Sequence, residues 1–117
     1  MRTLIKSVKI AFLALAITSA VQSNAQAPMS EPVAAALCAA HFGGIGYIQT
    51  KQGNTVVGAA NLKRFSFLDS EWGHLPEYVN ARKNIDANLA KDPSNMGKNL
   101  GSMGQACRQV GMPTAQF

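Results

Sequence analysis

The sequence predicts an all-α fold, a small up-down four-helix bundle closed by one disulfide and preceded by a signal peptide. Three observations lead to this prediction. Apolar residues recur at helical spacing in segments that glycine, proline and Asp-Pro breaks separate. The first 25 residues have the composition of an export signal. The chain of 117 residues contains two cysteines, an even number that suits a disulfide in an exported protein.

The signal peptide is predicted over residues 1–25. Three basic residues precede a short apolar run, and small residues end the segment at Ala25. The run is too short for a membrane-spanning helix, which needs roughly 20 apolar residues. We therefore expect cleavage after Ala25, with Ala27 as the alternative, and a single helical domain over residues 26–117. This domain would lie in the periplasm or outside the cell.

The charge of the chain gives no sign of a nucleic-acid partner. The formal net charge of +5 comes from 11 basic and 6 acidic residues. Three of the basic residues belong to the predicted signal peptide, so the remaining eight against six acidic residues leave +2. Such a small, mixed charge does not form the basic footprint of a nucleic-acid-binding domain.

The first helix is predicted over residues 33–48, with Pro32 in its opening turn. His41 is the only strongly polar side chain in this range, and a helix that is apolar all round is a buried one. One side of it carries small residues that would let a neighbouring backbone approach closely. Alternatively, the helix ends at Phe42, and the glycines at 43, 44 and 46 belong to a loop. The small residues of this side are Ala35, Ala39, Gly43 and Gly46.

Three further helices follow at short intervals. The second is predicted from Asn54 or Thr55 to about Trp72, although charged residues interrupt its apolar arc. The third begins at Pro76 and ends at Asp92-Pro93, and Ser94 is the predicted cap of the fourth. The inward arc of the second helix would include Val56, Val57, Phe67 and Leu68. The inward residues of the third would be Tyr78, Ile85 and Leu89, and those of the fourth Met96, Leu100, Met103, Cys107 and Val110.

The two cysteines fit this topology. In an up-down bundle the first and fourth helices are antiparallel neighbours. Cys38 lies early in the first helix and Cys107 late in the fourth, so antiparallel pairing places them at one level. The sequence therefore predicts a Cys38–Cys107 disulfide.

Metal and haem sites find little support. Cys38, His41, His74 and Cys107 are the only thiols and imidazoles after residue 25, and their spacing does not match the paired ligands of a structural zinc site. A haem between His41 and the methionines of the fourth helix lacks any Cys-x-x-Cys-His attachment sequence. Methionine at core spacing usually fills gaps between helices. No cofactor or metal is predicted.

The sequence also carries no catalytic signature. No serine stands in a Gly-x-Ser-x-Gly context. Asp69 and Glu71 are two residues apart, so on a helix their side chains point in different directions and do not form an acid–base pair. The glycines on either side of Ile45 are not part of a complete glycine-rich phosphate-binding motif. The basic pairs Lys63-Arg64 and Arg82-Lys83 lie close to acidic residues that dilute their field. We therefore expect a protein that is not an enzyme.

The function that remains is an exported interaction module that binds another envelope protein or a second copy of itself. Trp72 and Tyr78, on either side of the helix junction, would form one part of its surface; the alternative is that both rings are partly buried in the core. The small-residue side of the first helix would pack either inside the monomer or across a dimer. Membrane association is not expected after signal cleavage. Two alternatives stay open. The first is a periplasmic chaperone activated by acid or stress, in which protonation of a buried, neutral His41 would be one trigger. The second is a metal or haem carrier.

Overall fold

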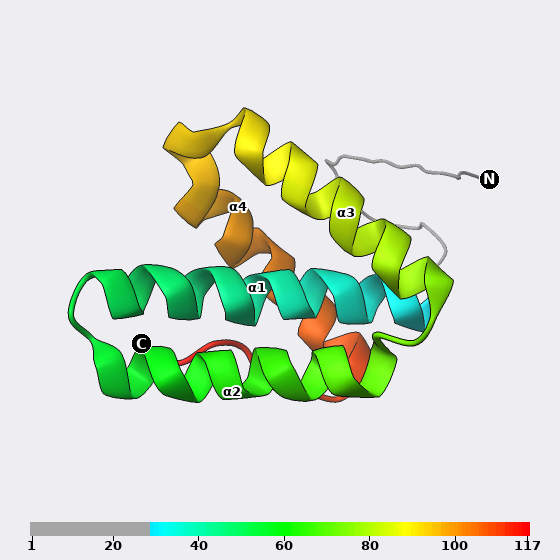
Figure 1. Ribbon diagram of the computed structural model, residues 1–117, viewed down its shortest axis with the longest axis horizontal. Coiled ribbons are helices and arrows are strands. Elements are labelled where there is room, and N and C mark those ends of the chain that lie inside the picture. Colours follow the sequence, from blue (N-terminus) through cyan, green and yellow to red (C-terminus); the bar gives the residue numbers. More distant parts are fainter. Residues whose placement is uncertain (1–28) are drawn as a thin grey trace.

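The computed structural model describes residues 29–117. The predicted signal peptide and its cleavage site lie outside these residues. Within them every regular element is helical, as Figure 1 shows, and Cys38 and Cys107 form a disulfide. The predicted all-α fold with four helices and one disulfide is confirmed. The elements are α1 (Glu31–Lys51), α2 (Thr55–Trp72), α3 (Pro76–Lys91), η1 (Pro93–Asn95), α4 (Met96–Met103) and η2 (Gly104–Val110).

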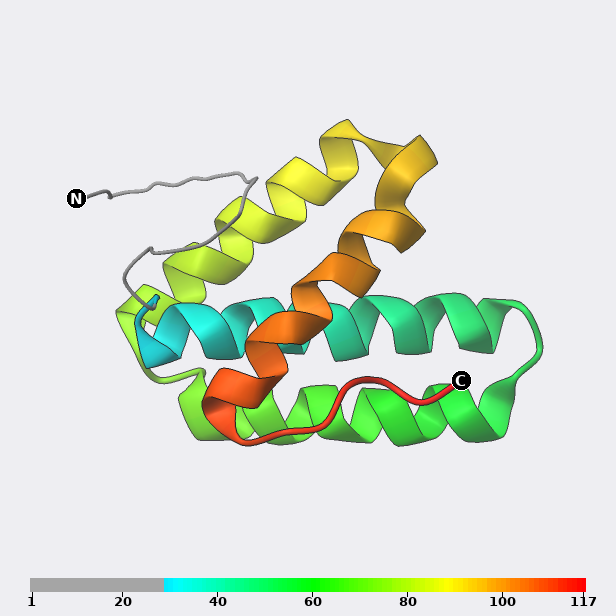
Figure 2. The ribbon, with the colours of Figure 1, turned by 180° about the vertical axis from the view of Figure 1, so that it is seen from behind.

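Helix α1 is the centre of the molecule. It is continuous through the glycines at 43, 44 and 46 and runs on to Lys51, so it does not end at Phe42. α2 lies antiparallel beside it, whereas α3 and the segment formed by α4 and η2 cross it obliquely (Figures 1 and 2). α2, α3, α4 and η2 all contact α1, as expected for a helix that is apolar all round. Among residues 29–117, no helix has the length and hydropathy needed to cross a bilayer.

The glycines of α1 allow its neighbours to approach closely. A Cβ atom on Gly46 would lie 2.9 Å from the backbone oxygen of Gly58 in α2, which is closer than real Cβ contacts. A Cβ on Gly44 would lie 2.5 Å from the side chain of Leu100 in α4. The hydroxyl of Thr50 donates to the carbonyl of Gly46 at 2.8 Å, on the same side of α1. Small residues therefore set how close α2 and α4 come to α1.

The helix boundaries follow local chemistry. Pro76 opens α3, and Gly111 follows η2 in the left-handed conformation with φ of 75°. The prediction that Ser94 caps the fourth helix is wrong, because Ser94 lies within the short η1 turn and α4 begins at Met96. The carboxylate of Asp92 accepts hydrogen bonds from Asn95 at 3.1 and 3.2 Å and from Ser94 at 3.5 Å, which stabilises this turn instead.

The core confirms the inward residues predicted for α3 and corrects those predicted for α2. Ile85 and Leu89 are buried, as is Tyr78, but Val56 is 84% exposed and Phe67 is 56% exposed. Leu68 of the predicted arc is buried as expected, but the inward face of α2 also includes Gly58 and Asn61, which lack large apolar side chains. The buried residues of α2 are Gly58, Asn61 and Leu68. The largest fully buried side chains of the core are Tyr78, Phe42, Leu68, Leu100, Asn61, Cys38 and Cys107.

Candidate functional site

The small-residue side of α1 packs inside the monomer. Ala35 and Ala39 are fully buried, and Gly46 is buried against Gly58 and Leu62. Gly43 is half-buried, and a Cβ on it would lie 3.0 Å from the ring of Phe65. α2 covers the two glycine positions, which are therefore not a free surface for a second copy.

Trp72 and Tyr78 do not form an exposed aromatic pair. Tyr78 is only 1% exposed and belongs to the core, while Trp72 is half-buried and packs against the core. The helix junction at Gly73–Leu75 separates them along the chain. Neither ring offers a partner the broad apolar surface that the sequence suggested.

The thiols and imidazoles do not assemble into a metal site. The disulfide between Cys38 and Cys107 uses both thiols, and His74 is exposed in the turn between α2 and α3. Both ring nitrogens of His41 are hydrogen-bonded to backbone groups. In residues 29–117 no three His, Cys, Asp or Glu side chains gather as metal ligands would. Met96 and Met103 are half-buried against the core.

An open hollow lies where α1 to α4 surround a space that none of them fills. It has a volume of about 320 Å³ and opens to solvent. Its lining is mostly apolar, with Arg82 and Asp86 of α3 as the charged members. The lining residues are Ala39, Ala40, Gly43, Gly44, Tyr47, Leu62, Phe65, Arg82, Asp86, Leu89, Met96 and Leu100.

A second open hollow of about 330 Å³ continues the first between α2 and α3. Phe65, Arg82 and Asp86 line both hollows. We call the two together the Arg82 groove. The remaining lining residues of the second hollow are Asp69, Gly73, Tyr78, Val79 and Lys83.

Arg82 is the polar centre of this groove. Its guanidinium lies 5.0 Å from the centroid of the Phe65 ring and 3.6 Å from the carboxylates of Asp69 and Asp86. It also donates a long hydrogen bond of 3.5 Å to the hydroxyl of Tyr78. The Nε–H is buried and has no hydrogen-bond partner in residues 29–117. A buried donor without a partner is costly, by about 1–3 kcal/mol.

The hydroxyl of Tyr78 stands beside the same cluster and donates to Asp69 at 3.1 Å. Burial raises the pKa of Tyr78 above its ordinary value of 10.0, and Asp69 adds to this effect while Arg82 opposes it. The folded protein therefore holds this proton at a pH where the unfolded chain releases it. The stability that Tyr78 contributes is complete below its unfolded pKa and is lost as the pH rises through its folded pKa.

We expect Tyr78→Phe to reduce the loss of stability between about pH 9 and about pH 11, because phenylalanine has no proton to lose. Urea unfolding at both pH values, for the wild type and the variant, measures the difference. Tyr47→Phe is the matched control, because that ring is 59% exposed. An equal loss of stability in the wild type and in Tyr78→Phe would contradict this assignment.

The residues after η2 form a second polar cluster. The backbone N–H of Ala115 donates to Nε2 of His41 at 2.9 Å, and the N–H of Gln116 donates to the side-chain oxygen of Asn61 at 3.0 Å. The carbonyl of Gln116 accepts from Asn61 at 2.9 Å and from Gln49 at 2.7 Å. Buried side chains thus hold the end of the chain by its backbone. We call residues 112–117 the C-terminal tail.

Sequence reasoning missed both clusters. From the sequence, Arg82 was considered only as one half of the basic pair Arg82-Lys83, whose electrostatic field nearby acidic residues weaken. The available signal was the four-residue spacing of Tyr78, Arg82 and Asp86, which places them on one side of α3. Asn61 and Gln49 gave no signal, since an amide inside a helix is usually exposed. Comparison with protein-family models, with curated proteins and with solved structures finds no match for this chain.

Proposed function

We propose that this protein is an exported, non-enzymatic interaction module that binds another protein of the cell envelope in the Arg82 groove. One observation carries the proposal. An open, mostly apolar hollow of about 320 Å³ is lined by Arg82, whose Nε–H is buried and has no partner in residues 29–117. Exposed apolar surface and an unpaired donor are both stabilised when a partner covers them.

The chemistry of the groove specifies its occupant. The apolar lining suits an aliphatic or aromatic side chain, and the Nε–H of Arg82 suits a neutral acceptor such as a backbone carbonyl. Asp69 and Asp86 already pair with the guanidinium, so an acidic group on the partner would compete with two carboxylates for it. The partner therefore presents an apolar side chain next to a free carbonyl.

Tyr47 provides the rim of the groove. It lines the first hollow and is 59% exposed, so its ring is free to pack on a partner. Tyrosine and arginine are enriched among the residues that dominate binding energy in protein interfaces. The export part of the proposal rests on the predicted signal peptide, and the disulfide is compatible with it, since such bonds persist in oxidising compartments.

A site-specific photocrosslinking experiment in intact cells tests this function. A benzoylphenylalanine in place of Tyr47 is expected to crosslink one defined envelope protein, and the same residue in place of Val56 is not. Val56 is the matched control because it is 84% exposed and does not line either hollow. Crosslinks between two copies of this chain, or none at position 47, would overturn the proposal.

The captured partner then allows a direct test with purified proteins. We expect Tyr47→Ala and Arg82→Lys each to weaken binding by roughly tenfold or more, as hot-spot residues do. Lysine keeps the positive charge between the two carboxylates but removes the Nε–H. Val56→Ala should leave the affinity unchanged. Equal affinities for all three variants would place the binding surface elsewhere.

A further inference from the structure

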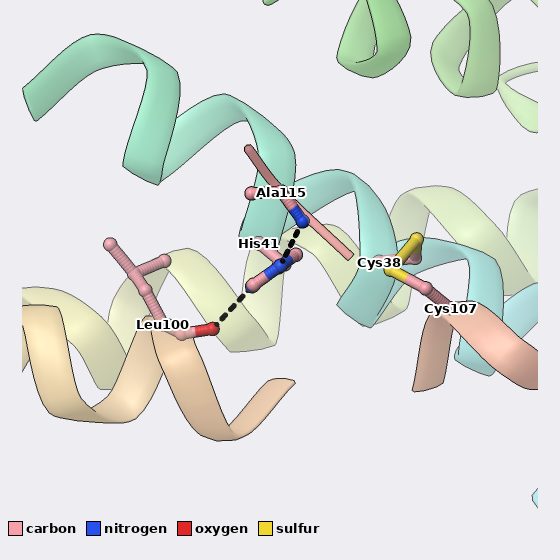
Figure 3. The surroundings of a disulfide bond; sticks show 5 residues. All are labelled: Cys38, His41, Leu100, Cys107 and Ala115. Carbon is pink, nitrogen blue, oxygen red and sulfur yellow. Dashed lines mark hydrogen bonds between the residues drawn. A yellow bond between two sulfur atoms is a disulfide. The ribbon is translucent and has the colours of Figure 1, made fainter. Parts of the chain in front are cut away.

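His41 holds the C-terminal tail in a way that requires an uncharged ring. Its side chain is 3% exposed, with Nδ1 2.8 Å from the carbonyl oxygen of Leu100 and Nε2 2.9 Å from the backbone nitrogen of Ala115 (Figure 3). The carbonyl only accepts, so Nδ1 carries the proton. The backbone N–H only donates, so Nε2 must be unprotonated. One neutral tautomer satisfies both contacts, and the imidazolium satisfies only one.

The ring has little room to find another arrangement. A Cβ on Gly104 would lie 2.7 Å from Cε1 of the imidazole, so the backbone of η2 lies directly against it. The Phe42 ring meets the imidazole edge-on, with centroids 5.5 Å apart. A proton added at Nε2 would therefore point at the N–H of Ala115, and the charge would be buried without an acceptor on that side.

No carboxylate compensates for such a charge. Both ion pairs found in residues 29–117 belong to Arg82, and neither involves His41. The guanidinium of Arg64 on α2 lies 5.8 Å from the centroid of the Phe42 ring, which itself packs on the imidazole. The charged side chains on the elements around His41 are Glu31 and Lys51 at the ends of α1, Lys63, Arg64, Asp69 and Glu71 on α2, Lys98 on α4 and Arg108 on η2.

The tail itself is a separable element. It has no helical structure, follows the left-handed Gly111, and lies along α2 (Figure 2). Ala115 is buried, whereas the residues on either side of it are exposed. Its backbone is held by His41, Asn61 and Gln49, so losing one of these contacts weakens a small unit and not the whole core.

We propose that His41 is a proton-operated latch for the C-terminal tail. Uptake of one proton from solvent at Nε2 replaces an acceptor by a donor and breaks the bond to Ala115. The tail then leaves, water reaches the ring, and the polar groups of Gln49 and Asn61 on α1 and α2 become accessible. The disulfide keeps α1 and η2 joined throughout, so only residues 112–117 move.

Nuclear magnetic resonance of the protein tests the latch directly. On acidification from about pH 7.5 to about pH 4, we expect the hydrogen-exchange protection of the Ala115 amide to fall at least about tenfold. Amides in the middle of α1 should keep their protection. Unchanged protection of Ala115 over this range would overturn the proposal.

Two variants separate His41 from general acid effects. His41→Gln offers an uncharged acceptor to Ala115, so its tail should stay protected at both pH values, whereas His74→Gln, at an exposed histidine, should behave like the wild type. A drop in His41→Gln equal to that of the wild type would refute the latch. If His41→Gln does not fold, the comparison of the wild type with His74→Gln at both pH values still decides, because a loss of Ala115 protection in both assigns the effect to a group other than His74.

Discussion

Replacing both Cys38 and Cys107 by alanine is expected to lower the free energy of unfolding by about 4 kcal/mol. The bond joins residues 69 positions apart, and closing a loop of that length removes much conformational entropy from the unfolded chain. A small domain has a total stability of about 5–15 kcal/mol, so this change is a large part of it. The Cys38–Cys107 bond also joins η2 to α1, and the C-terminal tail follows η2 directly. Removing the bond is therefore expected to loosen the tail as well.

Urea unfolding of the double variant and of the oxidised wild type measures this effect. Wild-type protein kept reduced by dithiothreitol is the matched control, because it loses the bond without any change of side-chain volume at two fully buried positions. Both samples should lose similar stability. A loss below about 1 kcal/mol in both would mean that the loop-entropy account fails for this protein.

Replacing Gly46 by leucine is the second change with a large expected effect, about 3 kcal/mol of lost stability. A Cβ at this position already meets the backbone oxygen of Gly58 at 2.9 Å and the side chain of Leu62 at 3.0 Å. A backbone oxygen in a packed helix cannot rotate away, so α1 and α2 must separate. Overpacking of this kind typically costs 1–3 kcal/mol, and here it disturbs the contact between the two longest helices.

Gly101→Leu is the matched control for Gly46→Leu. Gly101 is a helical glycine of α4, is exposed, and has nothing within 4 Å of a Cβ. Leucine there should leave the stability unchanged or raise it by up to about 1 kcal/mol, because glycine is a poor helix former. Thermal unfolding followed by circular dichroism compares the two variants. Equal effects of the two substitutions would show that the close contact at Gly46 is not needed.

The two expected results concern the same architectural feature. α1 packs against α2 through Gly46, against α4 through Gly44 and against η2 through the disulfide. These contacts leave little of α1 exposed apart from the side that carries Tyr47. The proposed binding groove therefore arises at the edge of this packing, where α2 and α3 diverge and Phe65 and Arg82 meet.

Local sequence patterns predicted the parts of the fold that depend on one helix at a time. The apolar spacing of Tyr78, Ile85 and Leu89 correctly gave the buried face of α3, and the near absence of polar residues gave α1 its central place. The pairing of Cys38 with Cys107 followed from their levels on two helices. These features depend on the spacing of apolar residues along a helix and on the order of the helices, both of which can be read from the sequence.

The face of α2 could not be predicted in this way. Its apolar arc would have buried Val56 and Phe67, yet the structure exposes both and buries Gly58 and Asn61. The close approach of Gly46 requires a small residue opposite, so the packing of α1 selects Gly58 over a larger apolar neighbour. Asn61 is then buried because it binds Gln49 and the backbone of the tail, contacts that lie 12 and 55 residues apart.

Residue spacing predicts the helical class, the disulfide and the burial of the first helix, because each of these depends on positions within or between regular elements. The packing of the helices against one another sets which face α2 buries, why the Nε–H of Arg82 has no partner in residues 29–117, and how His41 binds the backbone of Ala115. Those features depend on distances between side chains and backbone groups far apart in sequence, such as the 74 positions between His41 and Ala115. No local pattern encodes such distances, since they are set by how all four helices pack together.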